Sequence, residues 1–299
     1  MTPLDLSGTG VALITPFKNG AIDFNTLTNL IENVIKGGVE YVISLGTTGE
    51  ATSLSDIEQK AVIRHTIEVV NERVPIIAGQ FGGNNTDQLR EKLASFDPTG
   101  ISAILSSSPA YVKPSQEGVY RHYMVLAEAS PLPIIIYNVP SRTASNVSAA
   151  TIIRLAKDSD KIIGVKDASA DLYQASATAK GIPPEFFLLS GDDPTALAFI
   201  SNGGKGVISV IANAFPESFS SMIRFALGGE WGHARNIHYK LLELHQWLYI
   251  EGNPVGIKEA LSYMRLADAE VRLPLVTMSE INRKKLHAAM EAIKVPYEI

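Results

Sequence analysis

Cysteine is absent from the 299-residue sequence, and histidine is scarce. Without cysteine the chain cannot form disulfides, thiolate nucleophiles or thiolate-bound metal sites. The six histidines show neither His-x-x-x-His spacing nor flanking carboxylates, so we expect surface or packing roles and no metal site. They are His65, His122, His233, His238, His245 and His287. A cysteine-free chain also fits a reducing compartment, and we expect the cytoplasm.

Long apolar runs and basic clusters are missing as well. No apolar stretch reaches the roughly 20 residues of a membrane-spanning helix, and the first residues lack the basic and apolar parts of a signal peptide. The formal net charge of -5 and an isoelectric point near 5.7 argue against a nucleic-acid surface. We therefore expect an untargeted, soluble protein whose partners are small molecules and other subunits.

Short, β-rich apolar runs recur along the chain, with amphipathic, helix-compatible segments between most of them. Eight of these runs span residues 10–17, 39–46, 74–80, 101–108, 132–139, 161–168, 186–191 and 206–212. Near-continuous apolar strands that alternate with helices predict parallel pairing covered on both faces. Eight such repeats match a closed (β/α)₈ TIM barrel. With 45% hydrophobic residues, the chain can build one core of this size.

An open, doubly wound sheet is the alternative fold. The first strand–helix junction has no G-x-G-x-x-G dinucleotide motif, so we favour the barrel. After about residue 228 the strand pattern stops and apolar residues recur at helical spacing. Helices are expected over residues 230–251, 254–267 and 279–294. The prediction is a barrel over residues 1–228 and a C-terminal helical region over 229–299 packed on it.

One lysine ends an otherwise apolar strand, in the sequence Ile162-Ile163-Gly164-Val165-Lys166-Asp167-Ala168. Burial disfavours a charged ammonium group, and a free amine can attack a carbonyl carbon. Lys166 is therefore a candidate for Schiff-base chemistry. The alternative is a structural lysine whose amine reaches solvent at the strand end. A G-x-S-x-G nucleophile motif is absent, so amine catalysis is the leading interpretation.

Active sites of (β/α)₈ barrels lie at the C-terminal ends of the strands, here called the barrel mouth. Residues 46–50 (Gly-Thr-Thr-Gly-Glu) follow the second strand, and the hydroxyls and amides of Thr47 and Thr48 could hold a small carboxylate. The alternative there is an ordinary turn. Tyr137 ends the fifth strand and could transfer protons, and Arg142 could bind a second carboxylate. A core tyrosine beside a solvated arginine is the alternative.

The last two strands carry small residues that leave room at the mouth. The seventh ends in Ser190-Gly191-Asp192-Asp193, and the eighth contains Gly206-Val207-Ile208-Ser209. We interpret Asp192 and Asp193 as residues that start a helix rather than as catalytic acids.

In this order, the motifs resemble the dihydrodipicolinate synthase and N-acetylneuraminate lyase family of pyruvate-dependent class I aldolases, over essentially the whole chain. Residues 46–50 resemble the family's pyruvate-carboxylate loop, residues 137–143 its catalytic strand and residues 164–168 its Schiff-base strand. The sequence Ser108-Pro109-Ala110-Tyr111 resembles a segment that donates a tyrosine to the neighbouring subunit's site. Asn253-Pro254 resembles a pair near the mouth.

The resemblance implies a catalytic role for Lys166 as the Schiff-base lysine, with proton relay by Tyr137, Thr47 and Tyr111. The substrate-binding residues that it implies are Thr48, Arg142, Gly191, Ile208 and Asn253. It implies no metal and no organic cofactor, because the lysine supplies the electron sink and pyruvate is bound covalently as a substrate. It further implies a homotetramer, a dimer of dimers in which Tyr111 crosses the dimer interface.

Within the family, Arg142 favours the synthase branch, which keeps Ser-Arg-Thr where sialate lyases have small or apolar residues. The implied reaction joins pyruvate and L-aspartate-4-semialdehyde in diaminopimelate and lysine biosynthesis. One alternative is a sialate or 2-keto-3-deoxy-sugar-acid lyase of the same family. The other is a non-catalytic paralogue that binds pyruvate, against which the joint retention of Lys166, Tyr137, Thr47 and Tyr111 argues.

Regulation is expected to differ from that of lysine-inhibited relatives. Their allosteric pocket at the dimer interface carries a tyrosine, a histidine and a glutamate. The corresponding residues here are Ala110, Asp56 and Gln88, although Asn84 matches. We therefore expect weak or absent inhibition by lysine.

Overall fold

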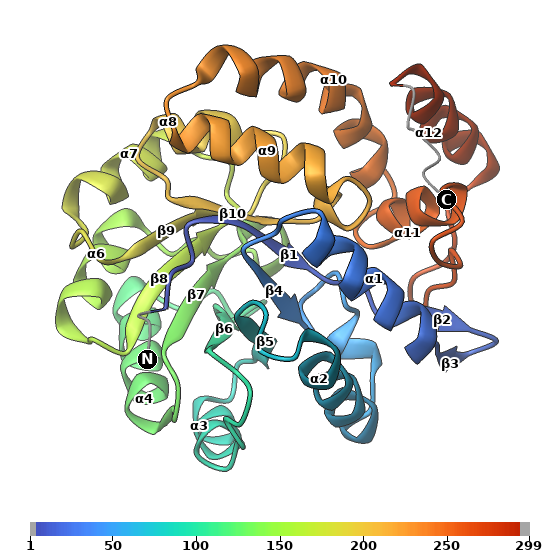
Figure 1. Ribbon diagram of the computed structural model, residues 1–299. Helices are drawn as coiled ribbons and strands as arrows, with labels where there is room; N and C mark the ends of the chain where they lie inside the picture. Colours follow the sequence, from blue (N-terminus) through green and yellow to red (C-terminus); the bar gives the residue numbers. More distant parts are fainter. Residues whose placement is uncertain (1–3, 294–299) are drawn as a thin grey trace.

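The structure is a computed structural model that describes residues 4–293, and it contains a closed barrel of parallel strands surrounded by helices (Figure 1). Around the ring the strands follow the order β1-β10-β9-β8-β7-β6-β5-β4, so that β1 pairs with β10 and closes the barrel. The barrel strands are β1 (Gly8–Ala12), β4 (Tyr41–Ser44), β5 (Ile76–Gly82), β6 (Ala103–Ser107), β7 (Ile134–Asn138), β8 (Ile162–Asp167), β9 (Phe187–Ser190) and β10 (Gly206–Ser209). A separate antiparallel hairpin joins β2 (Phe17–Lys18) and β3 (Ala21–Ile22). The predicted (β/α)₈ barrel is confirmed.

Helices connect successive strands and cover the outside of the barrel. They are α1 (Phe24–Lys36), α2 (Asp56–Val70), α3 (Thr86–Ala94), α4 (Gln116–Ala129), α5 (Pro140–Thr143), α6 (Ala149–Asp158), α7 (Leu172–Gly181), α8 (Ala196–Ser201) and α9 (Pro216–Leu227), with short 3₁₀ turns η1 (Ala51–Ser53) and η2 (Ile211–Asn213). Six of them begin after a polar side chain that accepts a hydrogen bond from a backbone N–H of the first turn, which fixes where each loop becomes a helix. These capping residues are Asp23, Ser55, Asn85, Ser115, Ser148 and Asp171.

The first strand departs from its predicted bounds, because β1 begins at Gly8 and the apolar run continues beyond its end. A Cβ atom on Gly10 would lie 2.1 Å from the ring of Tyr41. Only glycine at position 10 therefore lets the strand run this close to the buried ring. Beyond β1, the backbone N–H of Ile14 donates to Oδ1 of Asn213 at 3.2 Å. Residues 13–16 of the predicted run are therefore a buried connection rather than strand, and residue 17 belongs to β2.

Two hydrophobic cores fill the fold. The first lies inside the barrel and consists of Leu6, Ala12, Tyr41, Ile43, Ile77, Ala103, Leu105, Ile135, Leu189 and Ile208. The second lies between the strands and the surrounding helices and also includes residues of the C-terminal helices. Because the interior is packed with side chains, the barrel is a solid core and only its mouth can receive a substrate.

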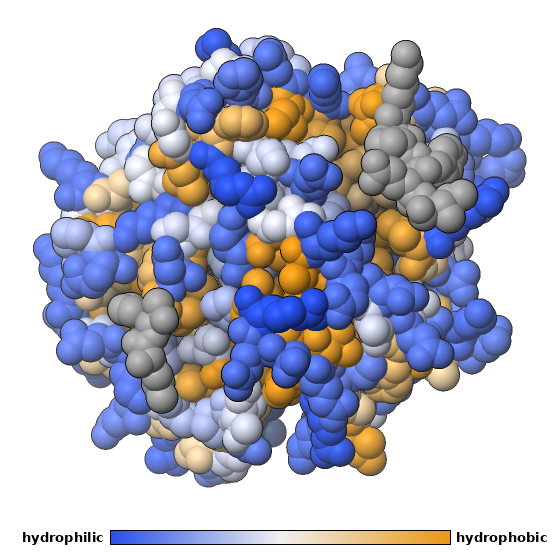
Figure 2. Space-filling model, viewed as in Figure 1, coloured by the Kyte–Doolittle hydropathy of each residue, from blue (hydrophilic) through white to orange (hydrophobic). Residues whose placement is uncertain are grey.

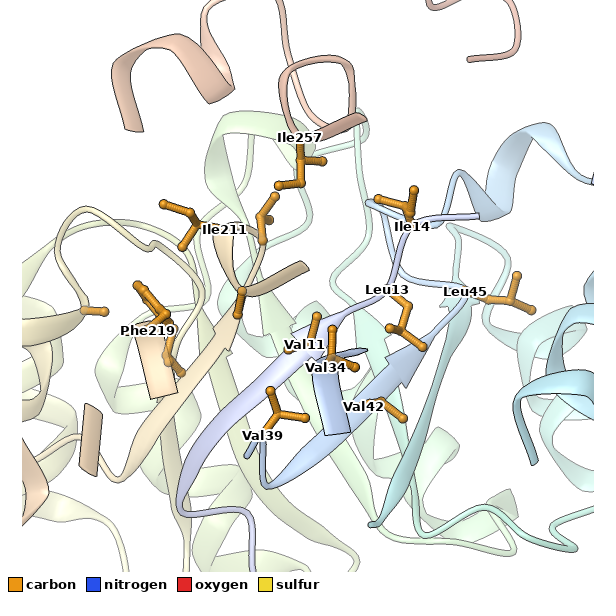
Figure 3. Close-up of a cluster of buried hydrophobic side chains, with 14 of the residues drawn as sticks. Val11, Leu13, Ile14, Val34, Val39, Val42, Leu45, Ile211, Phe219 and Ile257 are labelled. Carbon is orange, nitrogen blue, oxygen red and sulfur yellow. The ribbon is translucent and has the colours of Figure 1, made fainter. Parts of the chain in front are cut away.

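Three C-terminal helices follow the barrel, as the sequence predicts: α10 (Trp231–Tyr249), α11 (Val255–Tyr263) and α12 (Glu280–Ala292). Helix α10 packs along α9, and α12 packs on α10 and α11. Figure 3 shows Ile257 of α11 above the end of β1, between Ile211 and Ile14, and all three are buried. The expected boundary at residue 228 stays a prediction, and residue 294, the expected end of the last helix, lies outside the described residues.

The surface is mostly hydrophilic, as expected for a protein that buries its apolar residues. Hydrophilic residues cover most of the face drawn in Figure 2, and hydrophobic ones reach it in separate areas. Within residues 4–293, no helix has the length and apolar character needed to cross a membrane. The expectation that the N-terminus lacks a signal peptide rests partly on residues 1–3, and these lie outside the described residues.

Candidate active site

Lys166 lies at the mouth end of β8 and is buried, with 5% of its surface exposed. Its neighbours in strand register are Tyr137 on β7 and Leu189 on β9. The Nζ atom lies 4.3 Å from the centroid of the Tyr137 ring. The side chain is thus held inside the mouth rather than extended into solvent, which disfavours the structural alternative for this lysine.

Gly191 lies directly against the lysine stem. A Cβ atom at this position would come within 3.0 Å of both Cγ and Cε of Lys166. The backbone N–H of Gly191 donates to the carbonyl oxygen of Asp167 at 2.7 Å, which keeps the chain at this short distance. The structure therefore places predicted residues Lys166, Tyr137 and Gly191 together. Ile208, predicted to bind substrate, is buried in the barrel interior.

The amine of Lys166 is not engaged by a carboxylate. Among the residues that the structure describes, it takes part in no salt bridge within 4.0 Å. The adjacent Asp167 is buried too, but alternation along the strand sends its side chain to the opposite face of the sheet. Among residues 4–293, the amine therefore has the Tyr137 ring as a partner and no carboxylate.

Amide side chains surround the buried Asp167 carboxylate; we call Asn138, Asn146, Asp167 and Gln174 the amide network, in which only Asn146 is exposed. Oδ1 of Asp167 accepts hydrogen bonds from Asn138 Nδ2 at 3.1 Å and from the backbone of Ser169 at 2.9 Å. Its Oδ2 accepts one from Gln174 Nε2 at 3.0 Å. Asn138 follows Tyr137 and Asp167 follows Lys166, so these bonds fix the strand ends that carry both reactive groups.

The same network extends to the loop after β7. Asn146 accepts from Asn138 Nδ2 at 2.8 Å and donates to Oε1 of Gln174 at 2.7 Å. The backbone N–H of Val147 donates to Oδ1 of Asn138 at 2.9 Å. Sequence reasoning missed these network residues, because their partners lie on separate elements and leave no periodic pattern.

The Gly-Thr-Thr-Gly-Glu loop after β4 contains a tight turn in which Gly49 and Glu50 donate to the carbonyls of Gly46 and Thr47, both at 3.1 Å. Thr48 is buried, and its Oγ1 accepts a hydrogen bond from Nδ2 of Asn253 at 2.9 Å. The structure thus joins two predicted substrate-binding residues, Thr48 and Asn253, that are far apart in the sequence. Thr47 beside them is half-buried.

Glu50 ends this loop and forms an ion pair with Lys258 of α11 at 2.5 Å. The side chains are only 1% and 0% exposed, respectively. Burial lowers the pKa of Lys258, and the neighbouring Glu50 carboxylate opposes that shift. The prediction of site residues did not include this pair. The adjacent charged residues Lys258 and Glu259, among the apolar residues of α11, were an available signal.

Arg142 and Tyr111 are exposed, whereas Lys166 is buried. Arg142 belongs to the short helix α5 and is exposed. Tyr111 is 88% exposed and has a left-handed backbone with φ of 69°. Its N–H donates to the carbonyl of Thr143, the last residue of α5, at 3.0 Å. The two predicted residues therefore belong to adjoining surface segments.

The two aspartates after β9 play different parts. Asp192 Oδ2 accepts from the N–H of Thr195 at 3.1 Å, just before α8, as expected of a residue that starts a helix. For Asp193 that interpretation is wrong. Its buried Oδ2 accepts from the backbone of Val210 at 2.9 Å and of Ile211 at 2.8 Å, and from the hydroxyl of Tyr249 at 3.1 Å. Asp193 instead fixes the chain that follows β10.

Three of the four positions compared above with the lysine pocket of relatives line one cavity. A cavity of about 1020 Å³ lies between α2 and α3, and its lining includes Asp56, Asn84 and Gln88. Oδ1 of Asn84 accepts a hydrogen bond from the N–H of Ala110 at 2.9 Å. The residues that correspond to a lysine pocket in relatives are thus neighbours here, but three of the four differ chemically.

All six histidines lie on helices, as expected for packing or surface roles. They occupy α2, α4, α10 and α12. Across residues 4–293, no three His, Asp or Glu side chains are arranged to hold a metal ion. The expected absence of a metal and of a cofactor stays a prediction.

Comparisons with known proteins agree with the geometry. A sequence profile described as the Dihydrodipicolinate synthetase family matches residues 5–293. A 4-hydroxy-tetrahydrodipicolinate synthase of Flavobacterium psychrophilum is 46% identical over 91% of this chain and 93% of its own. A crystal structure of chloride-inhibited dihydrodipicolinate synthase from Acinetobacter baumannii, complexed with pyruvate, is 38% identical, with a TM-score of 0.93 over 97% of this chain and 100% of its own.

A third relative, described as the first monomeric dihydrodipicolinate synthase variant, is 34% identical, with a TM-score of 0.94 over 97% of each chain. These matches extend over nearly the whole length of both partners. The chain belongs to the dihydrodipicolinate synthetase family.

Proposed function

We propose that this chain is a 4-hydroxy-tetrahydrodipicolinate synthase, a lyase that condenses pyruvate with L-aspartate-4-semialdehyde in the diaminopimelate route to lysine. The observation that carries the proposal is the buried Lys166 at the mouth, with its amine 4.3 Å from the ring centroid of Tyr137. Curated relatives of the same name at 42–46% identity support it. The expected placement in the cytoplasm is part of this proposal.

The first half of the reaction forms an adduct with pyruvate. The pyruvate carboxylate binds the hydroxyls and amides of Thr47 and Thr48, which places the ketone carbon beside Lys166. The neutral amine adds to that carbon, and loss of water leaves an iminium. The iminium accepts the electron pair released when the pyruvate methyl group loses a proton, which gives an enamine. No metal or organic cofactor is required for these steps.

The second half joins the two substrates. The enamine carbon attacks the aldehyde of L-aspartate-4-semialdehyde, whose carboxylate is held by the exposed guanidinium of Arg142. The aldehyde oxygen takes up a proton and becomes the hydroxyl of the product. The amine of the semialdehyde then displaces Lys166 from the iminium carbon, closes the ring and frees the enzyme.

Proton transfer completes the proposal and implies an oligomer. Tyr137, Thr47 and the partner subunit's Tyr111 relay protons between the reacting groups and water. In one subunit Tyr111 is 88% exposed, so its ring is available to a second copy of the chain. We propose at least a dimer in which Tyr111 crosses the interface, assembled as a dimer of dimers.

The experiment that tests this function measures the initial rate with both substrates, coupled to NADPH oxidation by the reductase that uses the product. Lys166→Ala should lose both the rate and the pyruvate adduct that borohydride traps. Arg142→Ala should keep the adduct and mainly raise the KM for the semialdehyde. Trapped pyruvate on Lys166→Ala would refute the lysine assignment. If borohydride traps pyruvate on the wild-type protein but the coupled assay shows no rate, the second substrate would instead be a sugar acid.

A further inference from the structure

The Glu50–Lys258 pair joins the barrel mouth to the C-terminal helices. Nζ of Lys258 lies 2.5 Å from Oε1 of Glu50, donates to the carbonyl of Glu270 at 2.8 Å, and lies 4.1 Å from the ring centroid of Phe17. The second carboxylate oxygen of Glu50 accepts from the backbone N–H of Arg272 at 3.0 Å. Each charge therefore has fixed partners on segments distant in the sequence.

The pair acts on the loop that contains Thr47 and Thr48. Glu50 ends this loop, and its own N–H donates to the carbonyl of Thr47 at 3.1 Å. Asn253, which directly precedes the N-terminal cap of α11, donates to Oγ1 of Thr48 at 2.9 Å. The loop is thus held at two points, through Thr48 by Asn253 just before α11 and through Glu50 by Lys258 of α11.

Two features of Glu50 oppose stability. Its backbone is left-handed, with φ of 52°, a conformation that residues other than glycine adopt at a cost in free energy. A buried ion pair also contributes little stability relative to apolar residues of similar size, because both charges lose their hydration. Strained backbone and buried charge coincide at one residue of the predicted carboxylate loop. Such coincidence is typical of a functional site rather than of a stabilising contact.

We propose that Glu50 and Lys258 are positioning residues that set the Thr47–Thr48 loop for the carboxylate of pyruvate, an inference that rests on the function proposed above. Neither side chain touches the substrate. The C-terminal helices thereby take part in substrate binding, because the loop has its binding geometry only while α11 holds it. Removal of the pair lets the loop move relative to Lys166.

The effect should appear in pyruvate affinity more than in turnover. A displacement of the order of 1 Å in a positioning group can change the rate up to roughly a hundredfold. We expect Glu50→Gln and Lys258→Met to raise the KM for pyruvate between about tenfold and a hundredfold. Once saturating pyruvate has formed its adduct, kcat should change by less than about threefold, since the pair does not contact the reacting atoms.

The test compares these variants with a matched control on the same strand. Glu40, just before β4 at the opposite end of the barrel, pairs with Arg224 at 2.9 Å. Glu40→Gln removes a carboxylate of the same kind away from the mouth and should leave the KM for pyruvate unchanged. For every variant, the pyruvate dependence of the borohydride-trapped adduct is measured beside KM, kcat and thermal unfolding.

A single substitution leaves one buried charge unpaired and can prevent folding. The double variant Glu50→Gln/Lys258→Met removes both charges, and Glu50→Asp keeps the charge on a shorter side chain. Both should fold with a raised KM for pyruvate. A folded double variant or Glu50→Asp variant with wild-type KM would overturn the inference, as would an equal rise in Glu40→Gln. If the wild-type protein traps no pyruvate, the proposed function fails instead, and this inference with it.

Discussion

The ring of Tyr137 and the amine of Lys166 face each other across neighbouring strands, with 4.3 Å between Nζ and the ring centroid. Tyr137→Phe keeps this ring and removes only the hydroxyl. We expect the pyruvate adduct to form on this variant while kcat falls by about 10²–10⁴, the usual contribution of general acid–base catalysis. Borohydride trapping with mass spectrometry and the coupled assay measure the two effects. Tyr120→Phe, on the outside of the barrel, is the control, and an unchanged kcat in Tyr137→Phe would contradict the proton-relay role.

The exposed Tyr111 predicts that two inactive variants restore activity when mixed. In a dimer of one Tyr111→Ala and one Lys166→Ala subunit, one site has Lys166 and receives an intact Tyr111 from its partner. Random co-assembly should recover about a quarter of the wild-type activity, because half of the dimers are mixed and one of their two sites is complete. Activity of co-expressed, co-purified subunits checks this. No recovery in demonstrably mixed oligomers would show that Tyr111 serves its own subunit or none.

The amide network should contribute to both stability and turnover, which an exchange of hydrogen-bond donors and acceptors can test. Asp167→Asn places an NH₂ group against the donor of either Asn138 or Gln174, depending on the orientation of the amide, and we expect a loss of about 1–3 kcal/mol in the free energy of unfolding. Turnover should fall too, since the network fixes the strand end that carries Lys166. Adding Gln174→Glu supplies an acceptor for the new NH₂ group and should recover part of both losses. Urea unfolding and kcat give the readouts. A double variant no better than Asp167→Asn would argue against this hydrogen-bond account.

Stability should decline as the pH falls from about 6.5 to 4, in part because of His122. Burial lowers the pKa of His122 from 6.5 to about 4, and its Nδ1 lies 2.9 Å from the hydroxyl of Thr86. Between these values the unfolded chain binds a proton that the folded chain does not, so acid favours unfolding. The contribution is about 3 kcal/mol at most. Unfolding free energy followed against pH should have a shallower slope in His122→Gln over this range. Equal slopes in the two proteins would contradict the shift.

Lysine should inhibit this protein weakly or not at all. The cavity between α2 and α3 presents Asp56 and Gln88, and Ala110 bonds to Asn84 beside it. Without the tyrosine and glutamate of lysine-inhibited relatives, such a site should lose about 2–4 kcal/mol of binding free energy, by the usual size of interface hot spots. Calorimetric titration and rates with added lysine measure this. Micromolar binding would refute the prediction, and the triple variant Ala110→Tyr/Asp56→His/Gln88→Glu provides a gain-of-sensitivity control.

The barrel could be predicted because each strand leaves a local signal in the sequence, a short apolar run. Each apolar run of the sequence overlaps a strand, and the run over residues 161–168 contains β8, Ile162–Asp167. The first run differs most from its strand, since residues buried in a connection after β1 look the same in sequence as residues buried in a strand. Hydrophobic periodicity reports burial and not hydrogen-bond pairing.

Polar partners that meet across the fold could not be predicted in this way. Asn253 and Thr48 are 205 residues apart, and Arg272 and Glu50 are 222 residues apart. Neither member of such a pair alters the local pattern around the other. Asp193 shows the same limit, because an aspartate before a helix fits a cap equally well whether or not a distant backbone takes its carboxylate.

Closure of the ring by β1 and β10 has a consequence for how the protein is made. One edge of β1 stays unpaired until β10 has been synthesised, since Gly8 pairs with Gly206. The intervening strands must also be in place before the sheet can close. Contacts this distant in sequence fold slowly and leave unpaired strand edges exposed meanwhile. The residues that complete the mouth, Lys258 and Arg272, leave the ribosome later still. A nascent chain can therefore build most of its barrel well before it has a finished pocket.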